Sequence, residues 1–183
     1  SRFHHGGQHI ARMVDRGLTA SMTEFVVFQV LDALRQGREL RRAQSNGEWL
    51  DPPIAEPGKM PVGILGFGAL GQDVARRLID LSFPLKGWSR SVKSALHVAC
   101  FAGEAELPVF LADLKFLICL LPLTPATEGI LNAELFARLP TGAILMNVGR
   151  GGHLVERDLL AALDSGRLSL AMLDVFRDEP LPP

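Results

Sequence analysis

Apolar residues along this chain follow two patterns. Short apolar runs with the length of a buried strand occupy residues 62–65, 84–88, 116–121, 143–148 and 168–176. Between these runs lie segments in which apolar residues recur every three or four positions, as on one face of a helix, at 70–78, up to 111–114, at 132–139 and at 156–165. Strands that alternate with helices predict a parallel sheet covered on both faces, which is the doubly wound α/β class.

A long apolar segment near the start of the chain carries a helix-start signal. Ser21 and Glu24, three residues apart, form a predicted capping box, so we expect a long helix from Met22. Its first turns are apolar nearly all round, which predicts burial on more than one side, either between domains or against a second subunit. Residues 50–61 are rich in proline and predict an extended surface connection into the first strand of the sheet.

A glycine motif joins that first strand to the helix after it. Gly66, Gly68 and Gly71 form a Gly-x-Gly-x-x-Gly pattern. In such a motif the first glycine permits a tight turn, the second lets N–H groups approach phosphates, and the third lets the helix lie close to the strand. Three glycines in six positions also occur in ordinary turns, but the flanking strand and helix favour a dinucleotide pyrophosphate site at the helix N-terminus.

The residues after the second predicted strand bear on which dinucleotide is bound. A carboxylate roughly 20 residues beyond the glycines usually holds the free ribose hydroxyls of NAD. Residues 88–93 read Trp-Ser-Arg-Ser-Val-Lys and contain no carboxylate, whereas Arg90 and Lys93 with two serine hydroxyls suit a 2′-phosphate. The pattern therefore predicts NADP, with NAD less favoured. The alternative is a solvated loop that happens to be basic.

Composition narrows the range of partners. The 183 residues include 19 basic and 20 acidic side chains, spread along the chain rather than in blocks, and 48% are hydrophobic. This predicts a globular protein with neither nucleic acid nor an anionic membrane as partner. The apolar runs are strand-sized and no signal-peptide pattern opens the chain, so we expect a cytoplasmic protein. The two cysteines, Cys100 and Cys119, predict no structural disulfide.

Three further segments appear in order along the chain. They are Leu-Leu-Pro-Leu-Thr-Pro-Ala-Thr at 120–127, Asn-Val-Gly-Arg-Gly-Gly at 147–152 and Leu-Asp-Val-Phe-Arg-Asp-Glu-Pro at 173–180. Together they resemble the signature segments of the D-isomer-specific 2-hydroxyacid dehydrogenases, and the likeness runs from about Ala11 to Pro183. The Trp-Ser-Arg-Ser stretch and the Met-Thr-Glu helix start are similar to the glyoxylate/hydroxypyruvate reductase A branch of that family.

The resemblance implies a reaction and a set of site residues. The family moves a hydride between nicotinamide and C2 of a small 2-oxo or 2-hydroxy acid. Arg150 matches the arginine that pairs with the substrate carboxylate and carbonyl oxygen, and Glu179 matches the glutamate that hydrogen-bonds the catalytic histidine. Asp174, near the end of an apolar strand where an unpaired carboxylate is costly to bury, is implied to meet the nicotinamide carboxamide. The predicted cofactor-binding residues are Gly66, Phe67, Gly68, Ala69, Leu70, Gly71, Trp88, Ser89, Arg90, Ser91, Lys93, Leu121, Pro122, Thr127, Val148, Gly149, Arg150 and Asp174. For Leu121, Pro122 and Thr127 the alternative is a strand-end loop with proline-driven turns.

The chain departs from the family pattern in its proton donor. The family uses a histidine beyond the glutamate segment, and no histidine follows His153 in these 183 residues. His153 lies close after Arg150, but at a variable position before a helix, and is interpreted as a plain loop residue. Lys115 stands where relatives commonly carry an aspartate, and nothing in the sequence explains it.

The domain pattern departs from the family as well. Most of the substrate domain is expected to be absent, with residues 1–19 as its remnant, residues 10–14 as its last strand, and residues 20–183 as the NAD(P)-binding Rossmann domain. His4, His5 and His9 lie beside glycines near a chain end, which favours a frayed terminus over a metal site.

Two functions remain open from sequence. In the first, the chain is the cofactor-binding portion of an NADP-dependent reductase of glyoxylate or hydroxypyruvate that is poorly active alone. In the second, it is a non-catalytic module that binds nucleotide or dimerises, since relatives form homodimers through the dinucleotide domain and its long helix.

Overall fold

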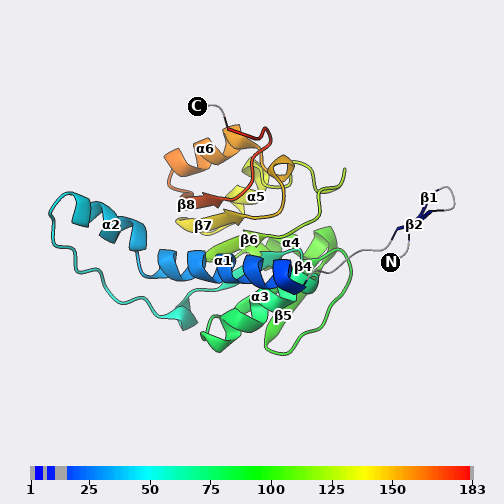
Figure 1. The fold of residues 1–183 in the computed structure, drawn as a ribbon, viewed down its shortest axis with the longest axis horizontal. Helices are drawn as coiled ribbons and strands as arrows, with labels where there is room; N and C mark the ends of the chain where they lie inside the picture. Colours follow the sequence, from blue (N-terminus) through cyan, green and yellow to red (C-terminus); the bar gives the residue numbers. More distant parts are fainter. Residues whose placement is uncertain (1–2, 6–7, 11–15, 182–183) are drawn as a thin grey trace.

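The structure is a computed structural model that describes residues 3–5, 8–10 and 16–181. Its centre is a six-stranded sheet with helices on both faces (Figure 1), which confirms the predicted doubly wound α/β class. The strand order is β5-β4-β3-β6-β7-β8, and every pairing in this sheet is parallel. The strands are β3 Val62–Leu65, β4 Leu85–Ser89, β5 Val98–Ala102, β6 Phe116–Cys119, β7 Ala143–Asn147 and β8 Leu168–Leu173.

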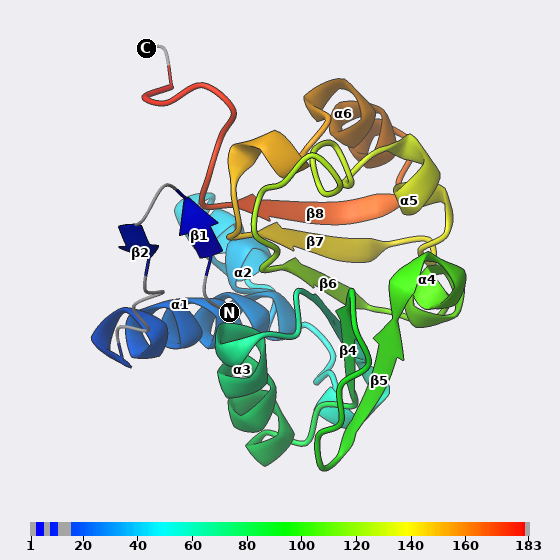
Figure 2. The same cartoon turned by 90° about the vertical axis from the view of Figure 1, so that its right-hand side faces the viewer.

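The helices divide between the two faces of the sheet (Figures 1 and 2), and a separate apolar core lies under each group. One core contains side chains of α1 and α3, and the other contains side chains of α4, α5 and α6. Because both faces are covered, β3, β6 and β7 are buried at every position, which explains their unbroken apolar runs. The helices are α1 Arg16–Leu34, α2 Gly37–Ser45, α3 Ala69–Asp80, α4 Gly103–Leu111, α5 Ala133–Ala137 and α6 Glu156–Asp164, with short 3₁₀ turns η1 Pro57–Lys59 and η2 Gly151–His153.

The strand order reverses beside β3. From β3 the chain passes through α3 to β4 on one side, and it later returns through α4 to β6 on the other side of β3. The connections that leave the carboxyl ends of β3 and β6 therefore diverge. Open α/β sheets bind ligands at such a point of reversal, outside the carboxyl ends of the strands.

The long first helix starts earlier than the capping box predicts. α1 begins at Arg16, so Ser21 lies inside the helix and cannot act as its cap, and the predicted start at Met22 is wrong. Val26 and Val30 are fully buried in the core shared with α3, whereas Phe28 is 60% exposed. Within the described residues, α1 is also the one helix that is long and apolar enough to cross a membrane, a property that core helices of globular proteins share.

The structure also bears on three smaller points of the sequence analysis. The helix predicted at 132–139 is α5, and Asn132 caps it, because its Oδ1 accepts the N–H of Leu135 at 3.0 Å. Residues 50–61 form an extended, largely exposed connection broken only by η1, also as predicted. Lys115 now has an explanation: its Nζ donates to the carbonyl of Gly142 at 2.6 Å and ties the start of β6 to the turn before β7.

Other elements escaped the sequence reading. β5, α2 and an antiparallel hairpin of β1 Phe3–His5 and β2 Gln8–Ile10 were not predicted. The predicted strand over 10–14 shares only Ile10 with β2, and residues 11–14 lie outside the described part of the chain. The expected domain boundary after residue 19 falls within α1.

Candidate functional site

The glycine turn lies at the carboxyl end of β3, the middle of the sheet. Gly66 has a φ of +101°, and a Cβ there would come within 2.7 Å of the backbone of Leu120, so only glycine fits. A Cβ at Gly71 would lie 2.6 Å from the carbonyl oxygen of Gly66, which shows how closely α3 approaches the turn. Two of the three glycines thus have the roles that the motif predicts.

The second glycine of the motif faces open space. Gly68 is the N-cap of α3, has an extended backbone, and has no atom within 4 Å of where its Cβ would lie. The first helical hydrogen bond runs from Gln72 N to Gly68 O, so the N–H groups of residues 69–71 are available at the helix N-terminus. An open space in front of free N–H groups and the positive end of a helix suits a pyrophosphate.

The loop after β6 lies against this glycine turn. Leu120 N donates to the carbonyl of Leu65 at 2.7 Å, which carries the β3–β6 pairing to the ends of both strands. Within the loop, Thr127 Oγ1 donates to the carbonyl of Pro122 at 2.7 Å and accepts the N–H of Thr124 at 2.9 Å. Thr127 therefore shapes the loop through bonds inside it, and its contact with a cofactor stays a prediction.

The loop after β7 holds Arg150 at the next position along the sheet. Asn147, fully buried at the end of β7, donates from Nδ2 to the carbonyl of Arg150 at 3.1 Å and accepts the N–H of Gly149 at 3.2 Å. The guanidinium of Arg150 is exposed, with Nη1 donating to the carbonyl of Gly149 at 2.7 Å. An exposed guanidinium on a main chain fixed by side-chain bonds can present its planar fork to a carboxylate.

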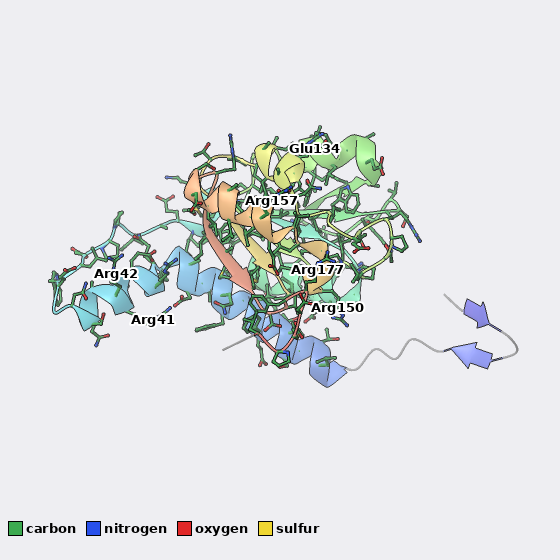
Figure 3. All side chains as sticks on the ribbon, turned by 90° about the horizontal axis from the view of Figure 1, so that it is seen from above. Arg41, Arg42, Glu134, Arg150, Arg157 and Arg177 are labelled. Atoms are coloured by element: carbon green, nitrogen blue, oxygen red, sulfur yellow. The ribbon has the colours of Figure 1, made fainter. Side chains whose placement is uncertain are left out.

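The segment after β8 lies beside the Arg150 turn at the carboxyl edge of the sheet. A Cβ on Gly151 would lie about 1.9 Å from the backbone of Phe176, so the Arg150 turn and the segment after β8 are in direct contact. Figure 3 shows Arg150 and Arg177 on the same side of the molecule, well away from Arg41 on α2. Glu179 lies in this segment, and its Oε1 accepts the N–H of Phe176 at 2.7 Å. The structure therefore brings the loops that carry Leu121, Arg150 and Glu179 to one edge.

Asp174 differs from its predicted setting. β8 ends at Leu173 instead of Phe176, so Asp174 is the first residue past the strand, and its side chain is exposed. Its main-chain N–H donates to the carbonyl of Asn147 at 3.1 Å. The expected cost of burying this carboxylate is absent, because the carboxylate is not buried.

The loop after β4 carries the predicted 2′-phosphate residues. Arg90 and Lys93 are exposed, and Ser89 Oγ donates to the carbonyl of Ser91 at 2.7 Å, which curls the chain directly after the strand. The carbonyl of Trp88 accepts the N–H groups of both Gly66 and Phe67 at 3.0 Å, so this loop starts next to the glycine turn.

Several predicted cofactor residues have buried side chains. The Trp88 indole donates to the carbonyl of Gly103 at 2.9 Å in the core, and the Phe67 ring lies against Gly87 of β4. Leu121 and Val148 are buried as well. At these four positions, only main-chain atoms are placed to contact a cofactor.

His153 contradicts its interpretation as a plain loop residue. It is 0% exposed, and its Nδ1 accepts the main-chain N–H of Arg150 at 3.1 Å. Burial lowers the pKa of His153 below its usual value of 6.5, so the ring is neutral at neutral pH. Sequence reasoning named this residue but assigned it no role, because burial of a polar side chain in a loop leaves no periodic signal.

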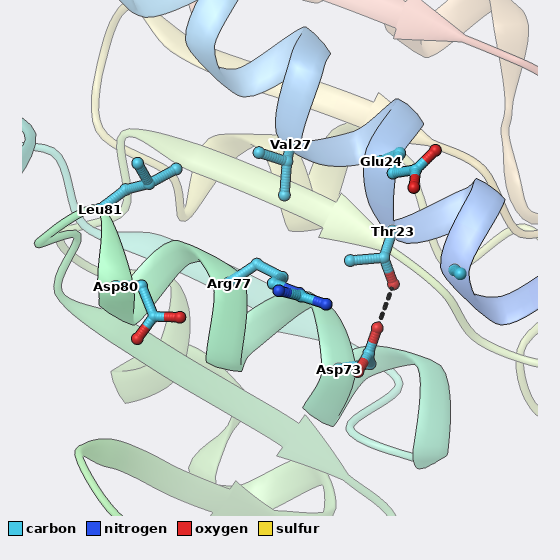
Figure 4. Close-up of a pocket in the computed structure, with 8 residues that line it drawn as sticks. Thr23, Glu24, Val27, Asp73, Arg77, Asp80 and Leu81 are labelled. Carbon is cyan, nitrogen blue, oxygen red and sulfur yellow. Dashed lines mark hydrogen bonds between the residues drawn. The ribbon is translucent and has the colours of Figure 1, made fainter. Parts of the chain in front are cut away.

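Two other features among the described residues do not supply this chemistry. Burial raises the pKa of Cys119 to about 12, which keeps this strand-end thiol protonated and unreactive. A hollow of about 400 Å³ lies between α1 and α3, lined in part by Glu24, Arg77 and Asp80 (Figure 4), and Thr23 Oγ1 donates to Asp73 Oδ2 there at 2.8 Å. These residues lie on α1 and on α3 beyond its first turn, outside the loops at the carboxyl edge.

Comparison with known proteins agrees with this geometry. Residues 27–183 match the family described as D-isomer specific 2-hydroxyacid dehydrogenase, NAD binding domain. A D-isomer specific 2-hydroxyacid dehydrogenase from Xanthobacter autotrophicus Py2, solved with NADPH and MES, is 42% identical with a TM-score of 0.91, over 94% of this chain and 72% of that chain.

Two further solved structures are similar. An NADPH-dependent glyoxylate/hydroxypyruvate reductase from Sinorhizobium meliloti, solved with NADP and sulfate, is 46% identical with a TM-score of 0.91, over 94% of this chain and 56% of that chain. A probable 2-hydroxyacid dehydrogenase from Rhizobium etli CFN 42, solved with NADP, HEPES and L(+)-tartaric acid, is 40% identical with a TM-score of 0.90, over 93% of this chain and 55% of that chain. The chain thus spans little more than half the length of these two proteins.

The glycine turn, the strand order and the three loops at one edge agree with what the matched family describes, a domain that binds NAD(P). The chain belongs to the D-isomer-specific 2-hydroxyacid dehydrogenases, and it contains their NAD-binding domain.

Proposed function

We propose that this chain is the cofactor-binding portion of an NADP-dependent reductase that converts a small 2-oxo acid, of the glyoxylate or hydroxypyruvate type, to the 2-hydroxy acid. The observation that carries the proposal is the meeting of four segments at one sheet edge: the glycine turn at α3, the loop with Pro122, the turn with Arg150 and the segment with Glu179. The Sinorhizobium meliloti and Rhizobium etli relatives, solved with NADP, support the same nucleotide here.

The residues present fit the nucleotide. Open space at Gly68 and the free N–H groups of residues 69–71 suit the pyrophosphate, and the basic loop with Arg90 and Lys93 suits a 2′-phosphate. No carboxylate lies in residues 88–93 to favour a free ribose hydroxyl or repel a phosphate. When bound, NADPH supplies the hydride for the reaction.

The protein side chains then manage charge on the oxo acid. Arg150 pairs its fork with the substrate carboxylate and carbonyl oxygen, which orients C2 and polarises the C=O bond. Glu179 has one carboxylate oxygen engaged by Phe176 N, and its Oε2 remains as the acceptor for the histidine that donates the proton. In the family that histidine follows the glutamate segment, so we expect residues 1–183 alone to bind NADPH and to turn over poorly.

Two measurements on the purified chain test this function. Titration of NADPH and NADH, followed by nucleotide fluorescence, should give a lower Kd for NADPH. Mixing with NADPH and glyoxylate should cause little change in nucleotide absorbance with time. Equal Kd values for the two nucleotides would contradict the NADP assignment, and sustained turnover would contradict the role given to a histidine beyond Glu179.

The second candidate function is a non-catalytic module that binds nucleotide or dimerises, and the exposed apolar face of α1 favours its dimerising part. Leu18 and Phe28 of α1 are 63% and 60% exposed, and Trp49 on the connection after α2 is 96% exposed. Large apolar side chains exposed on one helix are typical of a subunit interface. We propose that two copies pair through this domain in the cytoplasm, which is compatible with either function.

A further inference from the structure

His153 lies among the site residues, yet the proposed reaction assigns it no role. It is fully buried in η2, on the loop that carries Arg150. A neutral imidazole has one nitrogen that accepts and one that donates a hydrogen bond. Because Nδ1 accepts the N–H of Arg150, the proton of the neutral ring belongs on Nε2.

The first set of contacts fixes the main chain of Arg150. His153 holds it at both polar groups: Nδ1 accepts its N–H at 3.1 Å, and the His153 N–H donates to its carbonyl at 3.1 Å. Asn147 Nδ2 donates to the same carbonyl. The direction in which the Arg150 side chain leaves the loop therefore depends on a bond to the imidazole.

The second set of contacts faces the loop after β6. Nε2 of His153 is the one buried side-chain polar atom in the described part of the chain that has no hydrogen-bond partner. The backbone of Pro122 lies close enough to the ring to oppose the effect of burial on the pKa of His153. Because Nδ1 is engaged by Arg150 N, Nε2 is the nitrogen left for the Pro122 carbonyl. That carbonyl already accepts Thr127 Oγ1, and a carbonyl oxygen has a second lone pair for another donor.

We propose that His153 is a positioning residue that links the nucleotide loop to the substrate arginine: Nδ1 holds the Arg150 main chain, and Nε2–H closes onto the Pro122 carbonyl when nucleotide binds. Leaving a buried N–H without a partner is costly, so a small shift of the loop that completes this bond is favourable. Formation of the bond to Pro122 rests on the proposed function, because it requires bound nucleotide. The bond between Nδ1 and the Arg150 main chain does not depend on that function.

The nitrogen resonances of His153 test this proposal in the chain itself. In ¹⁵N NMR of the free protein, assigned by the loss of signals in His153→Asn, His153 should be neutral with its proton on Nε2. Saturation with NADPH should move the Nε2–H resonance downfield and slow its exchange with water at least severalfold. A proton on Nδ1 in the free chain would contradict the hydrogen bond from Arg150 N–H to Nδ1. An unchanged Nε2–H resonance in the chain saturated with NADPH would contradict the bond from Nε2–H to the Pro122 carbonyl.

A pair of variants separates positioning from packing. His153→Asn keeps an amide oxygen near the place of Nδ1 but has no group at Nε2, whereas His153→Leu is apolar and has neither. We expect hydrogen exchange at Arg150 N–H to stay within about threefold of wild type in His153→Asn and to rise at least tenfold in His153→Leu. In His153→Asn, NADPH should no longer change exchange at Arg150.

A residue that only filled space would give the opposite order, because leucine suits an apolar site better than asparagine. Equal protection of Arg150 N–H in the two variants would therefore contradict the proposal. Failure of the wild-type chain to bind NADPH would contradict the proposed function instead. The position of the ring proton in the free chain would still test the hydrogen bond from Arg150 N–H to Nδ1.

Discussion

The three glycines of the motif meet different surroundings. A side chain at Gly66 or Gly71 would collide with the main chain of the protein itself, whereas a side chain at Gly68 would enter empty space. Two of the glycines are therefore needed for the fold, whereas the open space at Gly68 is where we propose that the pyrophosphate binds.

This difference predicts that Gly68→Ala leaves folding intact and weakens nucleotide binding. Its backbone is extended, so alanine fits, but the methyl group occupies the phosphate space. We expect the NADPH Kd to rise by about tenfold or more, or roughly 1.4 kcal/mol, with the midpoint of urea unfolding nearly unchanged. Gly58→Ala in η1 is the control and should change neither, because its Cβ would make only an ordinary contact with the carbonyl oxygen of Ser82 at 3.9 Å. An unchanged Kd in Gly68→Ala would contradict the pyrophosphate site.

Arg90→Ala should reduce the preference for NADPH over NADH. Hydrogen bonds to charged groups contribute about 1.5–3 kcal/mol, so we expect the NADPH Kd to rise roughly ten- to hundredfold while the NADH Kd stays nearly constant. Arg42→Ala removes an exposed arginine of α2 and serves as the matched control. A preference that survives Arg90→Ala would refute the assignment of the 2′-phosphate to this loop.

Burial of His153 predicts that stability falls in mild acid. Because burial lowers its pKa, the unfolded chain binds a proton where the folded chain does not, and Arg150, the charged side chain that acts on the ring, works in the same direction. The contribution to stability is complete above the unfolded pKa of about 6.5 and is lost as the pH falls through the folded pKa. Urea unfolding between about pH 8 and about pH 5 should show a steeper decline for wild type than for His153→Asn. Parallel declines would show that another group is responsible.

Some residues of the site could be predicted from sequence and others could not. Gly66 and Gly71 have the surroundings that their spacing predicts, and Asn132 caps a helix as its position suggests. Arg150 was found by resemblance, since one arginine in a loop has no physical signature. The role of His153 was misjudged, because it depends on a partner three residues away in a turn whose geometry is visible only in three dimensions.

At the scale of elements, the most informative error concerns α1. Ser21 and Glu24 have the spacing of a capping box, but the same spacing also places two polar residues on the surface of a continuing helix, where the structure shows both exposed. β5 was missed although its five residues are all apolar, because it follows β4 without an intervening helix and so departs from the strand–helix alternation. Buried central strands such as β3 and β7 left no such ambiguity.

The exposed face of α1 predicts self-association. Phe28→Asp places a charge on this face without disturbing the buried side that packs on α3, so we expect loss of the dimer with little change in the stability of the monomer. Leu160→Asp on α6 is the matched control, because Leu160 is 61% exposed and Phe28 is 60% exposed. Sedimentation of wild type and both variants over a range of concentrations measures this. Equal association of wild type and Phe28→Asp would place the interface elsewhere or exclude it.

At the scale of the whole molecule, one topological feature arranges the site. The parallel sheet directs all six carboxyl ends to one edge, and the strand order reverses beside β3, which is the point where open α/β sheets bind ligands. Sequence could predict this because continuous apolar strands that alternate with helices leave few other topologies. It could not predict how closely the loops touch, since the contact of Gly151 with Phe176 joins segments that follow different strands.

The chain joins the parallel strands β4 and β5 through residues 90–97 without a helix, and the first part of this crossover, 90–94, is exposed. Substitution of such exposed residues changes the free energy of unfolding little. Exchange of basic for acidic groups in this loop should therefore shift the proposed preference from NADPH towards NADH without a compensating mutation in the interior.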